Sequence, residues 1–240
     1  MRVKAAKLKQ DNIIKWRSHE PSRIETFSDA AFAFALTLII VSLEVPHTFG
    51  ELMETMRGTL SFAICFAALF NIWNNQNIFF RRYGLKDAYT IALNAVLLFV
   101  VLIYTYPLKF LFELVFSGDN YYRHNGKAIL MIHDDQTQSL MLIYGAGFVA
   151  IYILFFLMYR HAQGCAEELD MSELELYETK TLANINLLCI CVCLLAISLA
   201  IILPLKWAGR TGFVYFLIPF AYSFWFSYRG RKRRELFPGN

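Results

Sequence analysis

The sequence predicts an all-α membrane protein with six transmembrane helices and both termini in the cytoplasm. Three observations lead to this fold class: an apolar composition, a series of long apolar runs and an uneven distribution of basic residues. Hydrophobic residues fill 57% of the 240 positions and aromatic residues 16%, which is more than a soluble domain needs for its core. The bilayer is therefore the expected surrounding of most of the chain.

Six apolar runs are each long enough to cross the hydrocarbon layer, which takes about 20 helical residues. Prolines mark several ends, because proline interrupts a helix: Pro46 follows the first run, Pro107 ends or kinks the third and Pro204 closes the fifth. The runs cover residues 23–45, 59–80, 88–106, 139–159, 181–203 and 211–228. They predict one six-helix domain (23–228) between two basic cytoplasmic tails (1–22 and 229–240).

Basic residues predict the orientation, because short loops rich in Lys and Arg stay in the cytoplasm. With the N-terminus inside, 17 of the 23 Lys and Arg residues fall on the cytoplasmic side. The connection at 107–138, a helical extension followed by a solvated loop, is then outside, and the connection at 161–180 is inside. The first run lacks a small-residue cleavage site, so it is expected to stay in the chain. We expect a multi-pass protein of the cell inner (plasma) membrane.

The first span has a well-specified beginning. Pro21 precedes Ser22, and Glu25 follows three residues later, the pattern of a capping box in which each side chain satisfies the other residue's backbone amide. Asp29 lies six residues past Arg23 and so about 9 Å deeper along the helix. An ionisable residue inside a span is costly, which makes Asp29 a functional candidate.

The polar partners of Asp29 are expected in the last turns of the second span, which reach the same depth. Amides and an indole gather there, at Asn71, Trp73, Asn74 and Asn75. They predict a polar brace between the first two helices, since polar side chains in bundles bond across helices. On the first helix the brace comprises Arg23, Phe27, Ser28 and Asp29.

Beyond Asp29 the first span is nearly uniform and apolar. At 100° per residue, five side chains fall on one stripe of the helix, namely Phe34, Thr37, Leu38, Val41 and Val45. The stripe is apolar apart from one hydroxyl. By itself it is typical of a surface that faces lipid or another helix.

The segment from Arg23 to Asp29 reads Arg-Ile-Glu-Thr-Phe-Ser-Asp. It resembles the Arg-x-x-x-Phe-Ser-Asp signature of the bacterial relatives of the endolysosomal potassium channel called transmembrane protein 175. In that family the motif opens the first helix, as here, and six-helix subunits with cytoplasmic termini assemble as tetramers around their first helices. The resemblance implies a potassium-selective channel, a homotetramer whose central pore is lined by the first helix, and potassium as the permeant ion.

The resemblance also implies roles for the stripe. The family's apolar pore positions correspond to Phe34, Leu38 and Val41, which would form a hydrophobic constriction. Thr37 corresponds to a position associated with cation selectivity. The chain departs from the family pattern at Phe34, where an aliphatic residue is common, and after Trp73, where relatives often have a histidine.

A second function remains in competition with the channel. In a proton- or cation-coupled secondary transporter, Asp29 would be the titrating carrier group, because an acid inside a span suits a proton relay as well as a brace. The two functions differ in throughput, since an alternating-access cycle cannot produce unitary channel currents.

Other functions have little support in the sequence. It holds no His-x-x-x-His pair, no Gly-x-Ser-x-Gly and no other assembled catalytic constellation, so an enzyme is not expected. The Cys-x-Cys-x-Cys run at 189–193 places successive thiols about 200° apart on a helix, so they cannot converge on a metal. The basic segment 229–234 adjoins the last span and suits anionic lipid headgroups better than nucleic acid. We expect neither a cofactor nor a bound metal.

Overall fold

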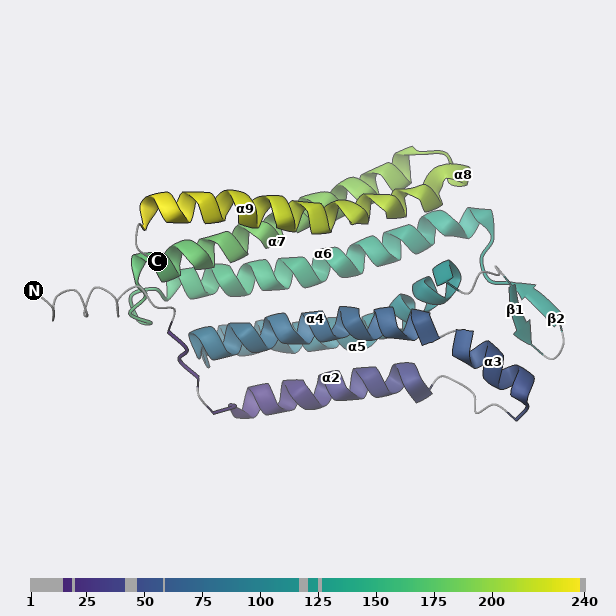
Figure 1. Cartoon of the computed structure of the whole chain (residues 1–240), viewed down its shortest axis with the longest axis horizontal. Coiled ribbons are helices and arrows are strands. Elements are labelled where there is room, and N and C mark those ends of the chain that lie inside the picture. Colours follow the sequence, from purple (N-terminus) through teal and green to yellow (C-terminus); the bar gives the residue numbers. More distant parts are fainter. Residues whose placement is uncertain are drawn as a thin grey trace, which may run out of the picture.

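The computed structural model describes residues 15–18, 20–41, 47–57, 59–116, 121–124 and 127–237. Six long helices run side by side along the longest axis of the molecule (Figure 1). They are α2 (Arg23–Val41), α4 (Thr59–Tyr83), α5 (Ala88–Phe116), α6 (Asp134–Gly164), α7 (Glu173–Ile202) and α9 (Leu217–Leu236). Each coincides with one of the six apolar runs, so the predicted all-α class is confirmed, with one short hairpin added.

Three of the helices are long and apolar enough to cross a membrane, judged over the described residues. They are Ala88–Leu111 in α5, Asp135–Gly164 in α6 and Glu173–Ile202 in α7. The other three carry charged turns: α2 opens with Arg23, Glu25 and Asp29, α4 ends in Arg81 and Arg82, and α9 ends in a basic stretch. Basic turns of this kind are typical of helix ends at a membrane surface.

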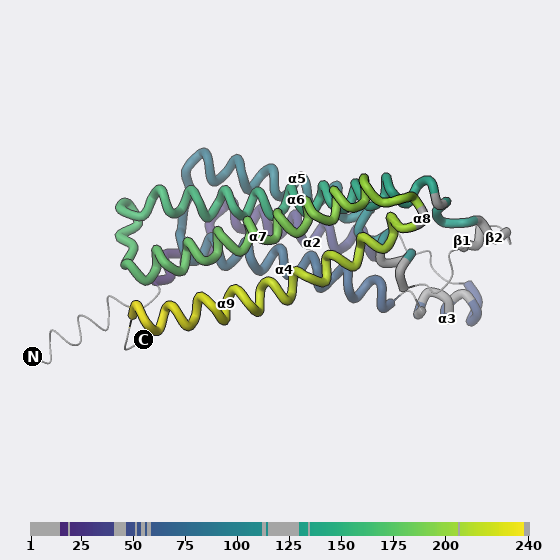
Figure 2. The backbone as a smooth tube through the Cα atoms, turned by 90° about the horizontal axis from the view of Figure 1, so that it is seen from above, coloured from purple at the N-terminus to yellow at the C-terminus, as the bar shows by residue number. Residues whose placement is uncertain are grey.

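The two ends of the bundle differ in composition, and successive helices alternate in direction between them. The basic end holds the start of α2, the α4–α5 and α6–α7 connections and the end of α9 (Figure 1). The hairpin end holds α3 (Phe49–Arg57), strands β1 (Tyr121–His124) and β2 (Lys127–Leu130), and α8 (Leu205–Ala208), as Figure 2 shows from above. The 3-10 helix η1 (Gly209–Phe216) leads from α8 into α9.

Two connections differ from the expectation. The third helix does extend through Pro107 to Phe116, but part of the expected solvated loop forms an antiparallel hairpin in which Tyr121 lies opposite Leu130. The connection expected at 161–180 is shorter and covers only residues 165–172. Helix α6 continues to Gly164, and α7 begins at Glu173, where Ser172 and Glu175 form its capping box.

The start of the predicted C-terminal tail is helical and packs on α7. The predicted boundary between 228 and 229 falls within α9, which continues to its end at residue 236. The guanidinium of Arg229 lies 3.8 Å from the ring centroid of Tyr177, and Arg233 Nη1 lies 3.1 Å from Glu178 Oε1. These contacts extend the bundle by about two turns beyond the predicted span.

Small residues let the central helices approach closely. A Cβ atom on Gly147 of α6 would lie 2.0 Å from the ring of Tyr104 on α5, so only glycine fits there. The Tyr104 hydroxyl donates to the carbonyl of Tyr144 at 2.7 Å, and the Tyr144 hydroxyl donates to the carbonyl of Pro107 at 2.7 Å. The α5–α6 pair is thereby fixed in position near the hairpin end.

Candidate functional site

Helix α2 begins as the sequence predicts. The backbone amide of Ser22 donates to Glu25 Oε1 at 2.9 Å, and the amide of Glu25 donates to Ser22 Oγ at 3.4 Å. This reciprocal pair confirms the capping box and fixes the position at which the helix starts.

One face of α2 is buried against the bundle. Among the described residues, α2 packs on α4 and α5 and lies at the edge of the molecule (Figure 1). Its buried side chains are Ser28, Phe32, Ala35 and Ile39, each at most 3% exposed. Their spacing is that of a single helical face.

The opposite face carries the predicted stripe and is open in the single chain. Phe34 is 56% exposed and Phe27, which shares this face, is 66% exposed. Thr37 is exposed and Leu38 is half-buried, while the side chain of Val41 and all of Val45 lie outside the described residues. A contiguous apolar face of this kind requires lipid or another protein chain as its neighbour.

Thr37 presents its oxygen on this open face. Its hydroxyl donates to the carbonyl of Ala33, one turn earlier, at 2.9 Å, which is a common bond for threonine inside a helix. Because the proton is engaged with the backbone, the oxygen keeps its acceptor lone pairs for another partner. The stripe therefore combines apolar walls with one oxygen that can contact a cation.

A buried chain of hydrogen bonds joins α2 to its two neighbours. Asn94 of α5 donates to Ser28 Oγ at 2.9 Å and accepts from Gln76 Nε2 of α4 at 3.0 Å. Ser28 donates in turn to the carbonyl of Ile24 at 2.7 Å. The three linked side chains are at most 1% exposed. A fully paired buried network specifies one packing of the helices, because any other packing leaves polar groups unpaired.

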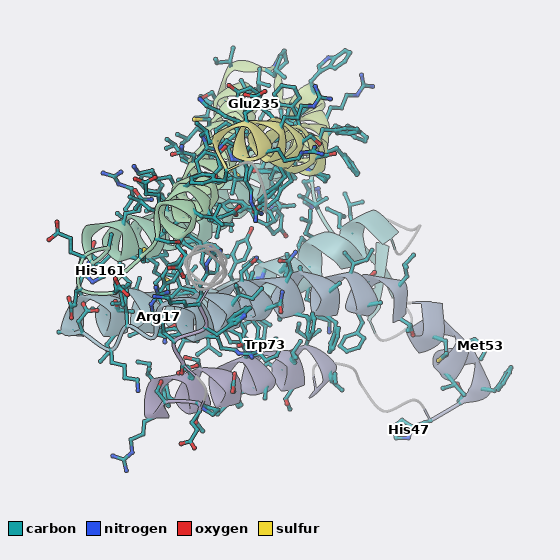
Figure 3. The ribbon with its side chains drawn as sticks, turned by 60° about the vertical axis from the view of Figure 1, so that its left-hand side comes forward. Arg17, His47, Met53, Trp73, His161 and Glu235 are labelled. Carbon is teal, nitrogen blue, oxygen red and sulfur yellow. The ribbon has the colours of Figure 1, made fainter. Side chains whose placement is uncertain are left out.

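The contact between Trp73 and Asp29 forms as part of the brace. Trp73 lies between α4 and α2 (Figure 3), and its indole N–H donates to Asp29 Oδ1 at 2.7 Å. The neighbouring amides take no part in it within the described residues: Asn75 Nδ2 donates to Asn71 Oδ1 at 2.8 Å along α4, and Asn74 is exposed. The structure thus joins Asp29 to Trp73 and, through Asn94, Ser28 to Gln76. Among the described residues, the predicted amides Asn71, Asn74 and Asn75 take no part in these contacts.

Sequence reasoning missed Asn94, and it placed Gln76 at the depth of the brace without counting it among the bracing residues. The available signal was depth: Asn94 is an amide in an apolar run, six residues after the third span begins, and Ser28 lies six residues after its cap. Equal depth brings the two side chains within reach when the helices are neighbours. Arg23, which was predicted to join the brace, has an exposed side chain.

A cavity of about 260 Å³ lies beside the motif at the basic end. Its walls come from the segment before α2, from α2 and from α4: Ser18, Glu20, Pro21, Glu25, Asp29, Gln76, Asn77 and Arg81. Three carboxylates against one guanidinium give the cavity a negative balance. Such a balance raises the local concentration of cations.

Comparison with known proteins gives consistent matches. The sequence model of the family described as endosomal/lysosomal potassium channel TMEM175 matches residues 23–104. A potassium channel of Marivirga tractuosa is 39% identical over 219 residues, which cover 84% of this chain and 85% of that protein. A potassium channel of Chamaesiphon minutus is 28% identical over 60% of this chain and 66% of that protein.

Two solved structures are also similar. The crystal structure of a variant of the potassium channel MtTMEM175, in complex with a Nanobody-MBP fusion protein, matches with a TM-score of 0.75 and 36% identity over 92% of this chain and 97% of that chain. That of a lysosomal potassium-selective channel TMEM175 homolog from Chamaesiphon minutus matches with a TM-score of 0.55 over 87% of this chain and 99% of that chain. At 21% identity, the second match shows likeness of fold alone.

Proposed function

This chain belongs to the TMEM175 potassium channel family, and on that premise we propose that it conducts potassium ions through a central pore lined by α2. The pore requires several copies of the chain, because one helix cannot enclose a passage. We propose a homotetramer in which the open face of each α2 turns toward the axis. The chain is thus a channel subunit in a lipid bilayer and not an enzyme.

The observation that carries this proposal is the division of α2 into two faces. A pore-lining helix needs a scaffold face that holds its position and an opposite face that is free of its own subunit. Phe32 and Ile39 lie on the buried face, whereas Phe34 and Thr37 lie on the open face. An ordinary core helix would be buried on both sides.

The chemistry of the open face supports a constriction and a contact site for cations. Rings of Phe34, Leu38 and Val41 from several subunits would form narrow apolar walls, which gate a pore by dewetting. A ring of Thr37 oxygens would contact a partly dehydrated potassium ion, because each oxygen retains free lone pairs. The acidic cavity near Asp29 would supply cations at the basic end.

The arrangement in the membrane follows the distribution of charge. We propose six spans with both termini in the cytoplasm and the basic end inward, in the inner (plasma) membrane. Positions 1–22 and 229–240 would then flank the channel domain at 23–228, although α9 continues past the second boundary. Two features support this orientation: the start of α2 and the end of α9 lie at the same end of the bundle, and basic residues concentrate there.

Recordings in planar bilayers under opposed potassium and sodium gradients test the proposal. The unmodified protein should give unitary currents with a reversal potential near that of potassium. Thr37→Val should shift the reversal potential toward that of sodium, because it removes the oxygen and nearly preserves the shape. Ser198→Ala is the matched control, since Ser198 is an exposed hydroxyl on α7 that also bonds one turn back, to the carbonyl of Leu194. An unchanged reversal potential in Thr37→Val would remove Thr37 from the selectivity site.

A further inference from the structure

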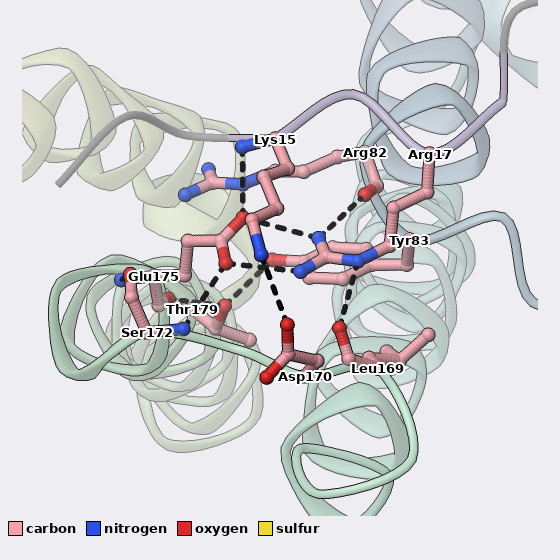
Figure 4. Close-up of polar contacts among 9 residues, drawn as sticks. All are labelled: Lys15, Arg17, Arg82, Tyr83, Leu169, Asp170, Ser172, Glu175 and Thr179. Atoms are coloured by element: carbon pink, nitrogen blue, oxygen red, sulfur yellow. Dashed lines mark hydrogen bonds and ion pairs between the residues drawn. The ribbon is translucent and has the colours of Figure 1, made fainter. Parts of the chain in front are cut away.

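A cluster of charged contacts joins the segment before α2 to the opposite side of the bundle. The guanidinium of Arg17 donates to both carboxylate oxygens of Glu175, at 3.1 Å and 2.9 Å (Figure 4). It also donates to the carbonyls of Leu169 at 3.0 Å and Arg82 at 3.2 Å. One side chain thus contacts the end of α4, the α6–α7 connection and the first turn of α7.

The backbone around Arg17 is held against the end of α4. The amides of Arg17 and Ser18 both donate to the carbonyl of Arg81, at 3.0 Å and 3.1 Å. Gly84, which follows α4, has a φ of +63° and would place a Cβ 3.4 Å from the Cβ of Arg17. The C-terminal carbonyls of a helix lack partners and carry a partial negative charge, so a guanidinium and two amides suit them.

Glu175 is the fixed side of the contact. Its carboxylate also accepts from the amides of Lys15 at 2.9 Å and Ser172 at 3.2 Å, the second bond being part of the capping box of α7. Its side chain is 2% exposed and that of Arg17 is 15% exposed. A bidentate, largely buried pair with every oxygen occupied holds a defined geometry, whereas an exposed pair does not.

This cluster links the segment before α2 to the α6–α7 connection and α7, which α2 itself does not touch in the described part of the chain, whereas the end of α4 also reaches α7 through the hydrogen bond between Tyr83 and Thr179 at 2.9 Å. Within the described residues, α2 packs on α4 and α5, and the element contacts include none between α2 and α6 or α7. The chain passes from Arg17 to the cap of α2 at Ser22 in five residues. A displacement of α7 or of the α6–α7 connection therefore reaches the start of α2 most directly through Arg17.

We propose that Arg17 and Glu175 form a clamp that positions the pore helix α2 relative to the α6–α7 pair. This inference rests on the proposed function, because it assumes that α2 lines the pore. The clamp fixes the position of the first turn of α2, which lies about three to four turns before Thr37. Both are positioning residues that act on permeation through α2 and do not touch the ion.

The test separates positioning from general support of the fold. Arg17→Lys retains the positive charge and replaces the planar fork with a point charge, which cannot maintain all four contacts. We expect assembled channels whose open probability differs by about fivefold or more from that of the unmodified protein. Their unitary conductance and reversal potential should stay unchanged, because the open face of α2 is intact. Lys15→Gln is the control, since the Lys15–Asp170 pair is exposed at 47% and 94%.

A double-substitution cycle identifies the pair itself. Arg17→Gln and Glu175→Gln should each alter open probability, and the combined variant should differ from the product of the two single effects. An open probability that is unchanged in assembled Arg17→Lys channels, or single effects that simply multiply, would overturn the clamp.

A second measurement does not depend on current. A Phe27→Cys variant places a thiol on the open face of α2, and its reaction rate with a membrane-impermeant maleimide can be followed by mass spectrometry. Adding Arg17→Lys should change that rate, whereas adding Lys15→Gln should not. Equal rates would contradict the clamp. Absence of potassium current from the unmodified protein would instead contradict the proposed function, so the two failures are distinguishable.

Discussion

Two faces of α2 carry the same kinds of residue at neighbouring positions and differ in their surroundings. Phe32 is 3% exposed and Phe34, two positions later, is 56% exposed. Ala35 is fully buried, whereas Ala33 is exposed. Hydropathy assigns the members of each pair the same value, so the difference comes from packing alone. One face positions the helix, and the other is left for lipid, a further subunit or the pore.

The largest expected contrast is between the two phenylalanines. Phe32→Ala should destabilise the fold by about 3 to 5 kcal/mol, because it leaves a cavity between packed helices. Phe34→Ala should leave the subunit fold nearly unchanged and increase basal potassium current, since it widens the proposed apolar constriction. Thermal unfolding of the detergent-solubilised protein and bilayer currents at matched protein density measure the two effects. If Phe34→Ala destabilised the fold as much as Phe32→Ala and did not increase the current, Phe34 would be an ordinary packing residue.

The same contrast shows what the sequence could predict. The six spans, the capping box at Ser22 and the stripe on α2 follow from local patterns, because hydropathy and spacing record them directly. Contacts between helices do not, since the partner of a side chain depends on rotation and depth together. Depth placed Trp73 and three amides together as candidate partners of Asp29, but among the described residues the indole of Trp73 bonds to it, whereas Asn74 is exposed and Asn75 bonds to Asn71 on its own helix.

The contact between Arg17 and Glu175 could not be predicted from the sequence, for a related reason. Arg17 and Glu175 lie 158 residues apart and outside the predicted spans, where charged residues are ordinary. The short connection between α6 and α7 brings Glu175 to the basic end beside Arg17. Because the connection was expected to be longer, no pattern in the sequence joined the two residues.

The next contrast compares two amides at the basic end. Asn94→Leu removes both hydrogen bonds that link α2 and α4 through α5 and leaves Gln76 without its acceptor, so it should destabilise the fold by about 1 to 3 kcal/mol. Asn74→Leu, a matched change at an exposed position of α4, should have little effect. Size-exclusion profiles and thermal unfolding of the two variants provide the measurement. If the two variants were equally stable, the buried chain of hydrogen bonds through Asn94 would not be what fixes the position of α2.

The smallest expected effect concerns Asp29, which lies at the border between the two faces. Asp29→Asn keeps an oxygen that can accept from the Trp73 indole, so a structural brace predicts a loss of at most about 1 kcal/mol and a conducting channel. Trp73→Phe removes the hydrogen-bond donor and leaves the carboxylate intact, and it should reduce stability by a similar amount.

The two variants separate the brace from the transporter alternative, because only Asp29→Asn removes a titratable group. If Asp29 carried protons or cations in a transport cycle, Asp29→Asn would abolish flux while Trp73→Phe preserved it. Potassium flux into liposomes at several pH values decides between them: parallel, small effects of both variants assign Asp29 to the brace that holds the scaffold face of α2 in place.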